Sequence, residues 1–373
     1  TGAFLWFWKK THGSTAGGGQ GPGPVEKDDE IDALVREAEN RLATSNLAKG
    51  AKLNNLPLVF IMGDAGSTKT STILHSGLDP ELLSGSVYQD TTVVPTRLAN
   101  IWFARGMVFV EAGGKLIAEP QRWVHLLQRL RPGRLLSAVR GEQAPRAAIV
   151  CLDAETFVRT GAADALTLAS RNLQQRLAEL SREFGISFPV YVLFTKMNRL
   201  AFFEDFVRNL SADEAGQVLG ATLPLRTQDA GGVYAEEEGK RLSAAFDAIF
   251  YSLADHRVAI LPRENDPQKV PGAYEFPREF RKLRNGLVQF LVNVCRPSQL
   301  RVSPFLRGFY FSGVRPVVVQ DAPVAAPRPS AAQQSAFEAA GSATGFFRAG
   351  ASPAAPATAT RARTASTSWW PPR

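Results

Sequence analysis

The stretch LPLVFIMGDAGSTKTSTILHSG, residues Leu56–Gly77, decides the fold of this chain. It opens with a short apolar run, Leu58–Met62, which has the length and composition of a buried strand. A glycine-rich turn follows, and then a helix-like segment, Ser71–Ser76, ends at Gly77, the residue type that most often follows a helix C-terminus. A strand, a glycine-rich turn, a Lys-Thr pair and a helix are together the context of a phosphate-binding P-loop.

The turn supplies eight candidate nucleotide-binding residues: Gly63, Asp64, Ala65, Gly66, Ser67, Thr68, Lys69 and Thr70. In a P-loop the backbone N–H groups of the turn and the helix N-terminus face an anion, Lys69 adds a point charge, and Thr70 binds Mg²⁺. The pattern requires glycine directly before the lysine, whereas this chain has Thr68, whose Cβ crowds the phosphate cradle. An ordinary strand–helix turn is the alternative interpretation.

Two further segments provide candidate ligands for the same nucleotide. A threonine-bearing loop precedes the strand expected at Leu98–Phe103, and in many nucleotide switches such a loop closes over Mg²⁺, so Thr92 is a candidate metal ligand. The strand expected at Met107–Glu111 ends in an acid, which can hold Mg²⁺ directly or through water, and the amide of Gly114 can approach a γ-phosphate. The alternative is that Glu111 is simply the first exposed residue after a strand.

A third segment suggests where a base would bind. The buried strand expected at Phe188–Phe194 leads into Thr195-Lys196-Met197-Asn198. Many guanine-nucleotide proteins hold the base with a lysine that stands two residues before an acid, so Lys196 and Asn198 are candidate nucleotide-binding residues. An amide in place of the acid can bond a base edge but lacks the charge-assisted pair that selects guanine.

Composition narrows the classes of function. Of 373 residues, 45% are hydrophobic and 21% charged, which is typical of a soluble globular protein. The net charge is +8, but about +4 of it lies after Gly313 in a segment of low complexity, so nucleic-acid binding is not expected. The two cysteines, Cys151 and Cys295, lie in apolar runs and are expected to be buried free thiols. With four scattered histidines they offer no four-ligand metal spacing.

The first residues carry a different signal. Phe4–Lys10, FLWFWKK, is similar to the end of a truncated transmembrane helix, with aromatic residues at the membrane interface and lysines on the cytoplasmic side. A cloning remnant or a loose aromatic segment is the alternative. The chain contains no run of 18 apolar residues.

Alternating strands and helices predict an α/β fold: a P-loop GTPase-like, mostly parallel sheet covered by helices on both faces and followed by a helical extension. Because parallel strands end at one edge of the sheet, the P-loop, Glu111 and Lys196 are expected to share one crevice. We expect a truncated membrane-helix end and Gly-rich linker at 1–24, an amphipathic helical lead-in at 25–55, the P-loop NTPase-like domain at 56–225, the extension with a return strand at 226–313, and a Pro/Ala-rich disordered tail at 314–373.

A series of short motifs follows the P-loop: Pro95-Thr96-Arg97, Trp102-Phe103, Met107–Gly114, Leu130-Arg131-Pro132, Leu173–Leu180, Gly185–Tyr191, Thr195-Lys196, Gln217–Gly220 and Leu306–Gly313. In this order they resemble the cytoplasmic region of the TssM/IcmF proteins of type VI secretion systems, from about Leu56 to Gly313. Each motif alone is weak, but so many in one order are specific.

The resemblance implies an inner-membrane protein with two N-terminal spans, this cytoplasmic domain, a further span and a large periplasmic part. The fragment itself would be soluble and would lie at the cytoplasmic face of the bacterial inner membrane, anchored by spans outside it. The implied partners are TssL and TssJ in the membrane complex, and TssK and other baseplate components in the cytoplasm.

Several positions depart from the family's pattern. Thr68 replaces the P-loop glycine, Glu111 replaces the family's Asp, Asn198 replaces the base-contacting Asp, and Ala112 lacks the usual Thr hydroxyl. Phosphoryl transfer depends on positioning and electrostatics, and a misplacement of about 1 Å can cost about 100-fold in rate. Efficient hydrolysis is therefore not expected, although Lys69 and Thr70 leave weak nucleotide binding open.

Three functions remain as hypotheses. The first is a scaffold of the type VI secretion membrane complex that has a degenerate nucleotide site and recruits baseplate and membrane partners. The second is an active P-loop ATPase or GTPase that couples hydrolysis to secretion or another regulatory process, with Lys69 as the phosphate clamp and Thr70 and Glu111 on Mg²⁺. The third is a soluble regulatory GTPase unconnected to membranes. Mg²⁺ with ATP or GTP is the cofactor the motifs suggest, no cofactor at all is the alternative, and no catalytic residue is assigned.

Overall fold

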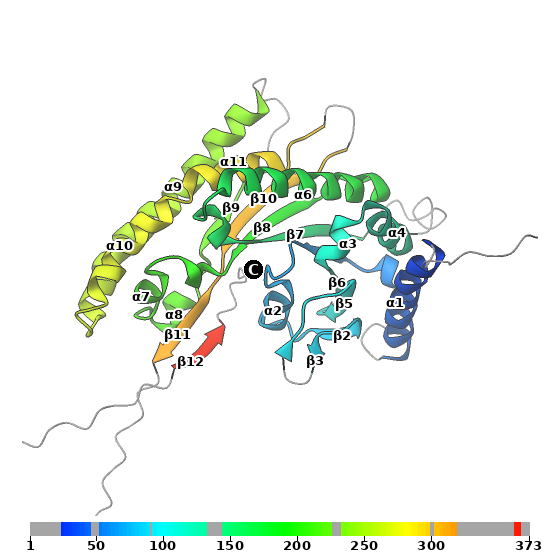
Figure 1. Ribbon diagram of the computed structural model, residues 1–373, viewed down its shortest axis with the longest axis horizontal. Coiled ribbons are helices and arrows are strands. Elements are labelled where there is room, and N and C mark those ends of the chain that lie inside the picture. Colours follow the sequence, from blue (N-terminus) through cyan, green and yellow to red (C-terminus); the bar gives the residue numbers. More distant parts are fainter. Residues whose placement is uncertain are drawn as a thin grey trace, which may run out of the picture.

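The computed structural model describes residues 24–45, 52–89, 92–132, 144–225, 233–298, 302–318 and 362–366 (Figure 1). An eight-stranded sheet forms the centre of this part of the chain. In order across the sheet, its strands are β2 (Glu81–Ser84), β5 (Ala99–Ala104), β6 (Met107–Ala112), β1 (Leu58–Met62), β7 (Arg146–Asp153), β8 (Pro189–Thr195), β10 (Phe305–Phe311) and β9 (Gly220–Thr222).

The five strands from β6 to β10 run parallel to one another, and the strands outside them are antiparallel to their neighbours. Short apolar runs bounded by turn residues therefore became parallel strands, as expected of an alternating strand and helix pattern. The prediction of a mostly parallel α/β sheet is confirmed.

Ten α-helices lie in the described ranges: α1 (Pro24–Thr44), α2 (Lys69–Leu74), α3 (Gly114–Ala118), α4 (Pro120–Leu130), α6 (Ala162–Phe184), α7 (Phe203–Val207), α8 (Ala212–Ala215), α9 (Tyr234–Ile260), α10 (Val270–Arg281) and α11 (Arg284–Val294). Short 3₁₀ turns lie at η1 (Leu53–Asn55), η2 (Ala154–Phe157), η3 (Met197–Arg199) and η4 (Leu261–Arg263). None of these helices is both long and apolar enough to cross a bilayer. The segment Phe4–Lys10 lies outside the described residues.

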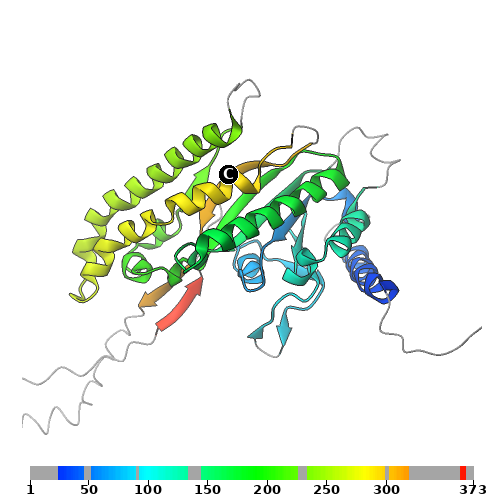
Figure 2. The ribbon, with the colours of Figure 1, turned by 45° about the horizontal axis from the view of Figure 1, so that its top comes forward.

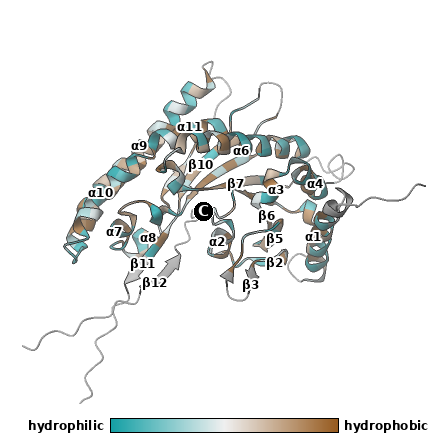
Figure 3. Ribbon diagram, in the orientation of Figure 1, coloured by the Kyte–Doolittle hydropathy of each residue, from teal (hydrophilic) through white to brown (hydrophobic). Residues whose placement is uncertain are grey.

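Helices cover the two faces of the sheet unequally. Because side chains alternate along a strand, neighbouring residues of β1 enter different cores. Phe60 packs edge-on against Trp123 of α4 and Phe184 of α6, with ring centroids 6.1 and 5.7 Å apart. Ile61 faces the other way, into a smaller core with Ile73 of α2. Figure 2 shows α6, α11 and α9 side by side over the first face, and Figure 3 shows the alternating teal and brown of amphipathic helices along α6 and α9.

The predicted helical extension is present as α9, α10 and α11, and the predicted return strand is β10. This strand lies between β8 and β9, so residues from the extension form part of the central sheet. Four phenylalanine rings, from α9, α10, β8 and β10, pack in series at this junction, two pairs stacked and the middle contact edge-on: Phe246, Phe280, Phe311 and Phe194.

Two segments differ from the sequence-based expectation. The segment 79–97, which includes the threonine-bearing loop expected before Leu98, contains the edge strand β2 and the small hairpin of β3 (Tyr88–Gln89) and β4 (Thr92–Val93). In the tail predicted to be disordered, β11 (Val314–Val318) and β12 (Ala362–Ser366) pair as antiparallel strands, because segments 44 or more residues apart in the chain satisfy each other's backbone groups. The rest of the tail lies outside the described residues.

Candidate functional site

The turn between β1 and α2 is the segment that the sequence predicts to be a P-loop, and several of its residues have left-handed or otherwise unusual backbone angles. Gly63 has φ +149°, and a Cβ at this position would lie 2.2 Å from the carbonyl oxygen of Cys151 on β7, so only glycine fits. Gly66 is left-handed, with φ +77°. Thr68 is also left-handed, with φ 59° and ψ 25°, at a cost of about 1–2 kcal/mol for a residue with a Cβ. The threonine at the position of the missing glycine therefore keeps a conformation that glycine would adopt more easily.

Lys69, the candidate phosphate clamp, bonds to its own loop. Its Nζ donates to the carbonyl oxygens of Gly63 at 2.9 Å and Asp64 at 2.8 Å, and Ser67 Oγ lies 3.5 Å away. The residue is only 5% exposed. Burial lowers the pKa of the Lys69 ammonium, and the charge of Glu111 acts in the opposite direction. Two of the three N–H groups of the ammonium are thus satisfied by backbone oxygen atoms.

Glu111 is fully buried and accepts hydrogen bonds from two hydroxyls on one oxygen. Thr70 and Thr96 each donate to Oε1 at 2.5 Å. Asn100 Nδ2 donates to Oε2 at 3.0 Å, and Trp102 Nε1 donates to the same oxygen at 3.2 Å. Four donors from three elements therefore surround this carboxylate, which is how a buried charge is normally stabilised. The alternative interpretation of Glu111 as an exposed strand end is wrong.

Thr70 and Glu111 are brought together as predicted, but the loop threonine at this site is Thr96. Thr92, the residue predicted from the sequence, lies in β4, and the structure describes only its backbone. Asn100 and Trp102 were not predicted as site residues. Asn100 could have been noticed, since it is a polar residue within an otherwise apolar strand. The β5–β6 pairing places it directly opposite Glu111.

Gly114 lies against the P-loop. A Cβ on Gly114 would approach the backbone nitrogen of Ala65 to 2.9 Å, so the turn after β6 and the P-loop pack backbone to backbone. This closeness places the Gly114 amide beside the P-loop, which is where the sequence motif predicted a contact with a terminal phosphate.

The residues predicted to contact a base are bonded to other groups of the protein. Lys196 has φ 58°, and its Nζ forms an ion pair with Asp153 Oδ2 at 2.9 Å. Asn198 Oδ1 accepts from the backbone N–H of Val314 at 3.4 Å. The preceding residue, Thr195, donates to the carbonyl oxygen of Ser67 at 3.1 Å and so joins the end of β8 to the P-loop.

The expected convergence of the three strand ends is therefore observed. β6 and β7 flank β1, and β8 is the next strand, so the P-loop, Glu111 and Lys196 all lie at one edge of the sheet. The oxygen chemistry of Thr70 and Glu111 suits Mg²⁺. A cation at Thr70 would have to share a carboxylate that already holds four donors, so the residues fit Mg²⁺ only with rearrangement.

Comparisons with known proteins add a family assignment. Residues 118–350, more than half of the chain, match the model of the IcmF-related N-terminal domain. The chain belongs to the IcmF-related family. It is 27% identical over 311 residues to the type VI secretion system component TssM1 of Pseudomonas aeruginosa, an alignment that covers 77% of this chain and 26% of that protein. The chain thus spans about a quarter of the length of this relative.

Two solved structures show distant likeness. One is a signal recognition particle receptor SRβ-GTP/SRX complex from Chaetomium thermophilum, with a TM-score of 0.23 and 20% identity over 38% of this chain and 70% of that chain. The other is a GTP-binding protein from Sulfolobus solfataricus in complex with GDP, with a TM-score of 0.20 and 16% identity over 48% and 52%. At these TM-scores neither likeness supports an inference about binding.

Proposed function

We propose that this domain is a scaffold at the cytoplasmic face of the inner membrane, where it recruits the other parts of a type VI secretion system. Its nucleotide site is degenerate in this proposal, and the polar groups of the site hold the fold together. The partners that the family resemblance suggests are TssL and TssJ in the membrane, and TssK and other baseplate components in the cytoplasm. No nucleic acid is involved.

The observation that carries the proposal is the state of the two charged groups of the site. Lys69 donates to two carbonyl oxygens of its own loop, and Glu111 accepts from four protein donors. A phosphate would compete with the longest Lys69 contact, 3.5 Å to Ser67 Oγ, and Mg²⁺ would compete with the donors on Glu111, whose bonds are each worth about 0.5–1.5 kcal/mol net, or up to about 3 where a charge takes part. The metal end of the site is therefore occupied by the protein's own donors.

A second function is supported by one specific arrangement. Thr70 Oγ1 lies 2.5 Å from Glu111 Oε1, and Gly114 packs against Ala65. A hydroxyl beside an acid, with a glycine amide near the loop, is the geometry that positions Mg²⁺ and a γ-phosphate in P-loop enzymes. The rival proposal is therefore an ATPase or GTPase that keeps its metal end.

Nucleotide binding and turnover separate the two proposals. We expect radiolabelled ATP and GTP with Mg²⁺ to show no turnover above a protein-free blank, and Lys69→Ala to give the same result. Addition of nucleotide should also leave co-purification of the chain with TssK and TssL unchanged. Robust hydrolysis that Lys69→Ala abolishes, while circular dichroism shows the variant folded, would overturn the degenerate-site proposal. If no type VI component co-purifies with the chain, the scaffold proposal fails.

A further inference from the structure

The second face of the sheet is only partly covered where β8 lies beside β10. On β8, Val192 and Phe194 point to the first face and are fully buried, whereas the alternating residues Tyr191 and Leu193 are partly buried and border the smaller core. Tyr310 of β10 pairs with Leu193 in the sheet and is also partly buried. We call Tyr191, Leu193 and Tyr310 the β8–β10 face. It is an apolar and aromatic surface that the described residues leave half open.

Two glycines hold the Tyr310 ring close to the sheet. A Cβ on Gly220 of β9 would lie 2.4 Å from this ring, and a Cβ on Gly308 of β10 would lie 2.8 Å from its hydroxyl oxygen. The hydroxyl is also fixed by a hydrogen bond of 2.6 Å with Thr222 Oγ1. The ring of Tyr191 is next to it, with centroids 6.4 Å apart and planes at 32°. Two rings that are already positioned form a platform on which a flat apolar side chain can stack.

A cation lies at the rim of this platform. Arg307 of β10 is partly exposed, and no hydrogen bond or ion pair joins its guanidinium to another described residue. Burial raises the pKa of Tyr191, and the charge of Arg307 acts in the opposite direction, so the guanidinium is near the ring. A guanidinium stacks favourably on an aromatic face, and tryptophan is the best such partner. The β8–β10 face therefore suits a tryptophan better than an aliphatic side chain.

The antiparallel pair of β11 and β12 directs a tryptophan-bearing segment to this face. β11 leads away from the sheet, and β12 returns, so that Ser366 stands opposite Val314. Val314 is only four residues after Tyr310. The chain continues from Ser366 into Thr367-Ser368 and then Trp369-Trp370-Pro371-Pro372. Four extended residues span at most about 14 Å, so both tryptophans are within reach of Tyr310.

The other side of this sheet edge is already filled. A Cβ on Gly313 would lie 2.9 Å from the ring of Phe203, and Phe311 is buried against Phe280 of α10. A segment that continues from Ser366 therefore finds packed side chains on the first face and the half-open β8–β10 face on the second.

We propose that the segment Trp369–Pro372 binds the β8–β10 face of its own chain, with the indoles stacked on the tyrosine rings and against Arg307. Pro371 and Pro372 favour the extended polyproline II conformation, so the segment loses little entropy when it binds an aromatic surface. The pairing of β12 with β11 tethers the segment beside its site, which raises its effective concentration there. The proposal does not depend on whether the nucleotide site is degenerate or active.

Tryptophan quenching of a bimane label tests the contact in the full chain. Cys151 and Cys295 are buried, so Thr222→Cys at the border of the face introduces one accessible thiol for the label. Trp369→Phe together with Trp370→Phe should raise the emission of this label about twofold or more, because a tethered segment is bound most of the time. Tyr191→Ser should raise the emission in the same way when both tryptophans are present. The phenylalanine variants change no residue of the described fold, so misfolding does not explain their effect.

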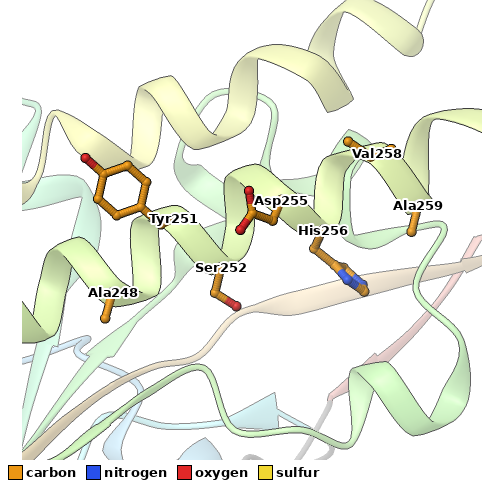
Figure 4. Close-up of a pocket in the computed structure, with 7 residues that line it drawn as sticks. All are labelled: Ala248, Tyr251, Ser252, Asp255, His256, Val258 and Ala259. Carbon is orange, nitrogen blue, oxygen red and sulfur yellow. The ribbon is translucent and has the colours of Figure 1, made fainter.

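The outer side of α9 supplies the matched controls. Tyr251 is 62% exposed on this helix, and Figure 4 shows it projecting from a shallow hollow that is lined by α9 alone. Tyr251→Ser should leave the quenching at position 222 unchanged, and a label on Tyr251→Cys should not respond to the phenylalanine variants.

Three results would overturn the proposal. The first is emission at position 222 that is the same with and without the two tryptophans. The second is quenching that weakens on dilution, because the segment of another copy would then be the occupant. The third is quenching by the tryptophans of a label on Asp64→Cys in the exposed part of the P-loop, but not at position 222, because the segment would then lie in the crevice.

Discussion

The site at the strand ends has two parts, named for the portion of a nucleotide that each was predicted to contact: a phosphate end with Lys69 and Glu111, and a base end with Lys196 and Asp153. They contain similar polar residues in very different surroundings. At the phosphate end, Lys69 is 5% exposed and Glu111 is fully buried, and the bonds around them come from the P-loop, the loop before β5, and β5 itself. At the base end, the side chains of Lys196 and Asp153 are 19% and 17% exposed, and their ion pair borders on solvent. The phosphate end is thus part of the core, whereas the ion pair of the base end is partly exposed.

Because of this difference in burial, the two ends should contribute unequally to the stability of the fold. A buried acceptor or donor that loses its partner costs about 1–3 kcal/mol, because water cannot replace the bond. A partly exposed ion pair contributes about 0–1 kcal/mol, because water and ions compete for it. Substitutions at the phosphate end should therefore lower the free energy of unfolding, whatever their effect on ligand binding. Substitutions at the base end should change the free energy of unfolding little.

The largest effect is expected for Glu111→Ala. The change leaves the donors of Thr70, Thr96, Asn100 and Trp102 without their acceptor, and we expect a loss of about 3–5 kcal/mol in the free energy of unfolding. Urea denaturation followed by circular dichroism measures this loss.

Asp153→Asn is the matched control at the base end. Asparagine keeps the hydrogen bond from Glu155 N, which Asp153 accepts at 3.0 Å, and removes the charge that pairs with Lys196 at 2.9 Å and with Arg199 at 3.8 Å. The loss should stay below about 1 kcal/mol. Equal losses for the two variants would show that the contrast between the ends is wrong.

A smaller effect, with its own pH signature, is expected for Lys69→Met. The variant loses two hydrogen bonds to carbonyl oxygens, which together contribute about 1–3 kcal/mol to the free energy of unfolding. Part of this loss is offset because methionine carries no charge that must be buried. Because burial lowers the pKa of Lys69, the unfolded chain binds more protons than the folded one between that lowered pKa and about 10.4. The free energy of unfolding of the wild type should therefore rise with pH in that window.

Urea titrations of both proteins from pH 7 towards pH 10 test the sign. The difference in unfolding free energy between the wild type and Lys69→Met should grow as the pH rises, since only the wild type gains stability by releasing this proton. A difference that stays constant or shrinks would mean that the Lys69 ammonium is not disfavoured by its surroundings.

Much of the phosphate end was readable from sequence because it depends on local pattern. The P-loop context placed Lys69 and Thr70, and the two-residue turn at Arg105-Gly106, with φ 48° and 79°, set the hairpin register. That register pairs Ala104 with Met107 and hence Asn100 with Glu111, so the buried amide partner could have been found by counting back from the turn.

Other contacts had no local signal. The sequence of the threonine-bearing loop does not distinguish Thr92 from Thr96. An irregular backbone has no repeating geometry that would predict which side chain faces the site. The bond from Val314 to Asn198 joins residues 116 positions apart and depends on β10 lying beside β8. Long-range contacts of this kind follow from the assembled sheet, and so the base end was the part of the crevice that the sequence described least well.

The smallest effect is expected for Asn198→Asp, which restores the acid of guanine-nucleotide proteins. A carboxylate can accept the Val314 N–H as the amide does, so the free energy of unfolding should change by less than about 0.5 kcal/mol. No affinity for GDP should appear, because Lys196 stays paired with Asp153 and the phosphate end stays closed on Lys69.

Combining Asn198→Asp with Asp153→Asn frees Lys196, and isothermal titration with GDP and ADP then tests the base end alone. If the phosphate end controls binding, the double variant should bind neither nucleotide. If the double variant prefers GDP, the base end and not the phosphate end prevents nucleotide binding in the wild type.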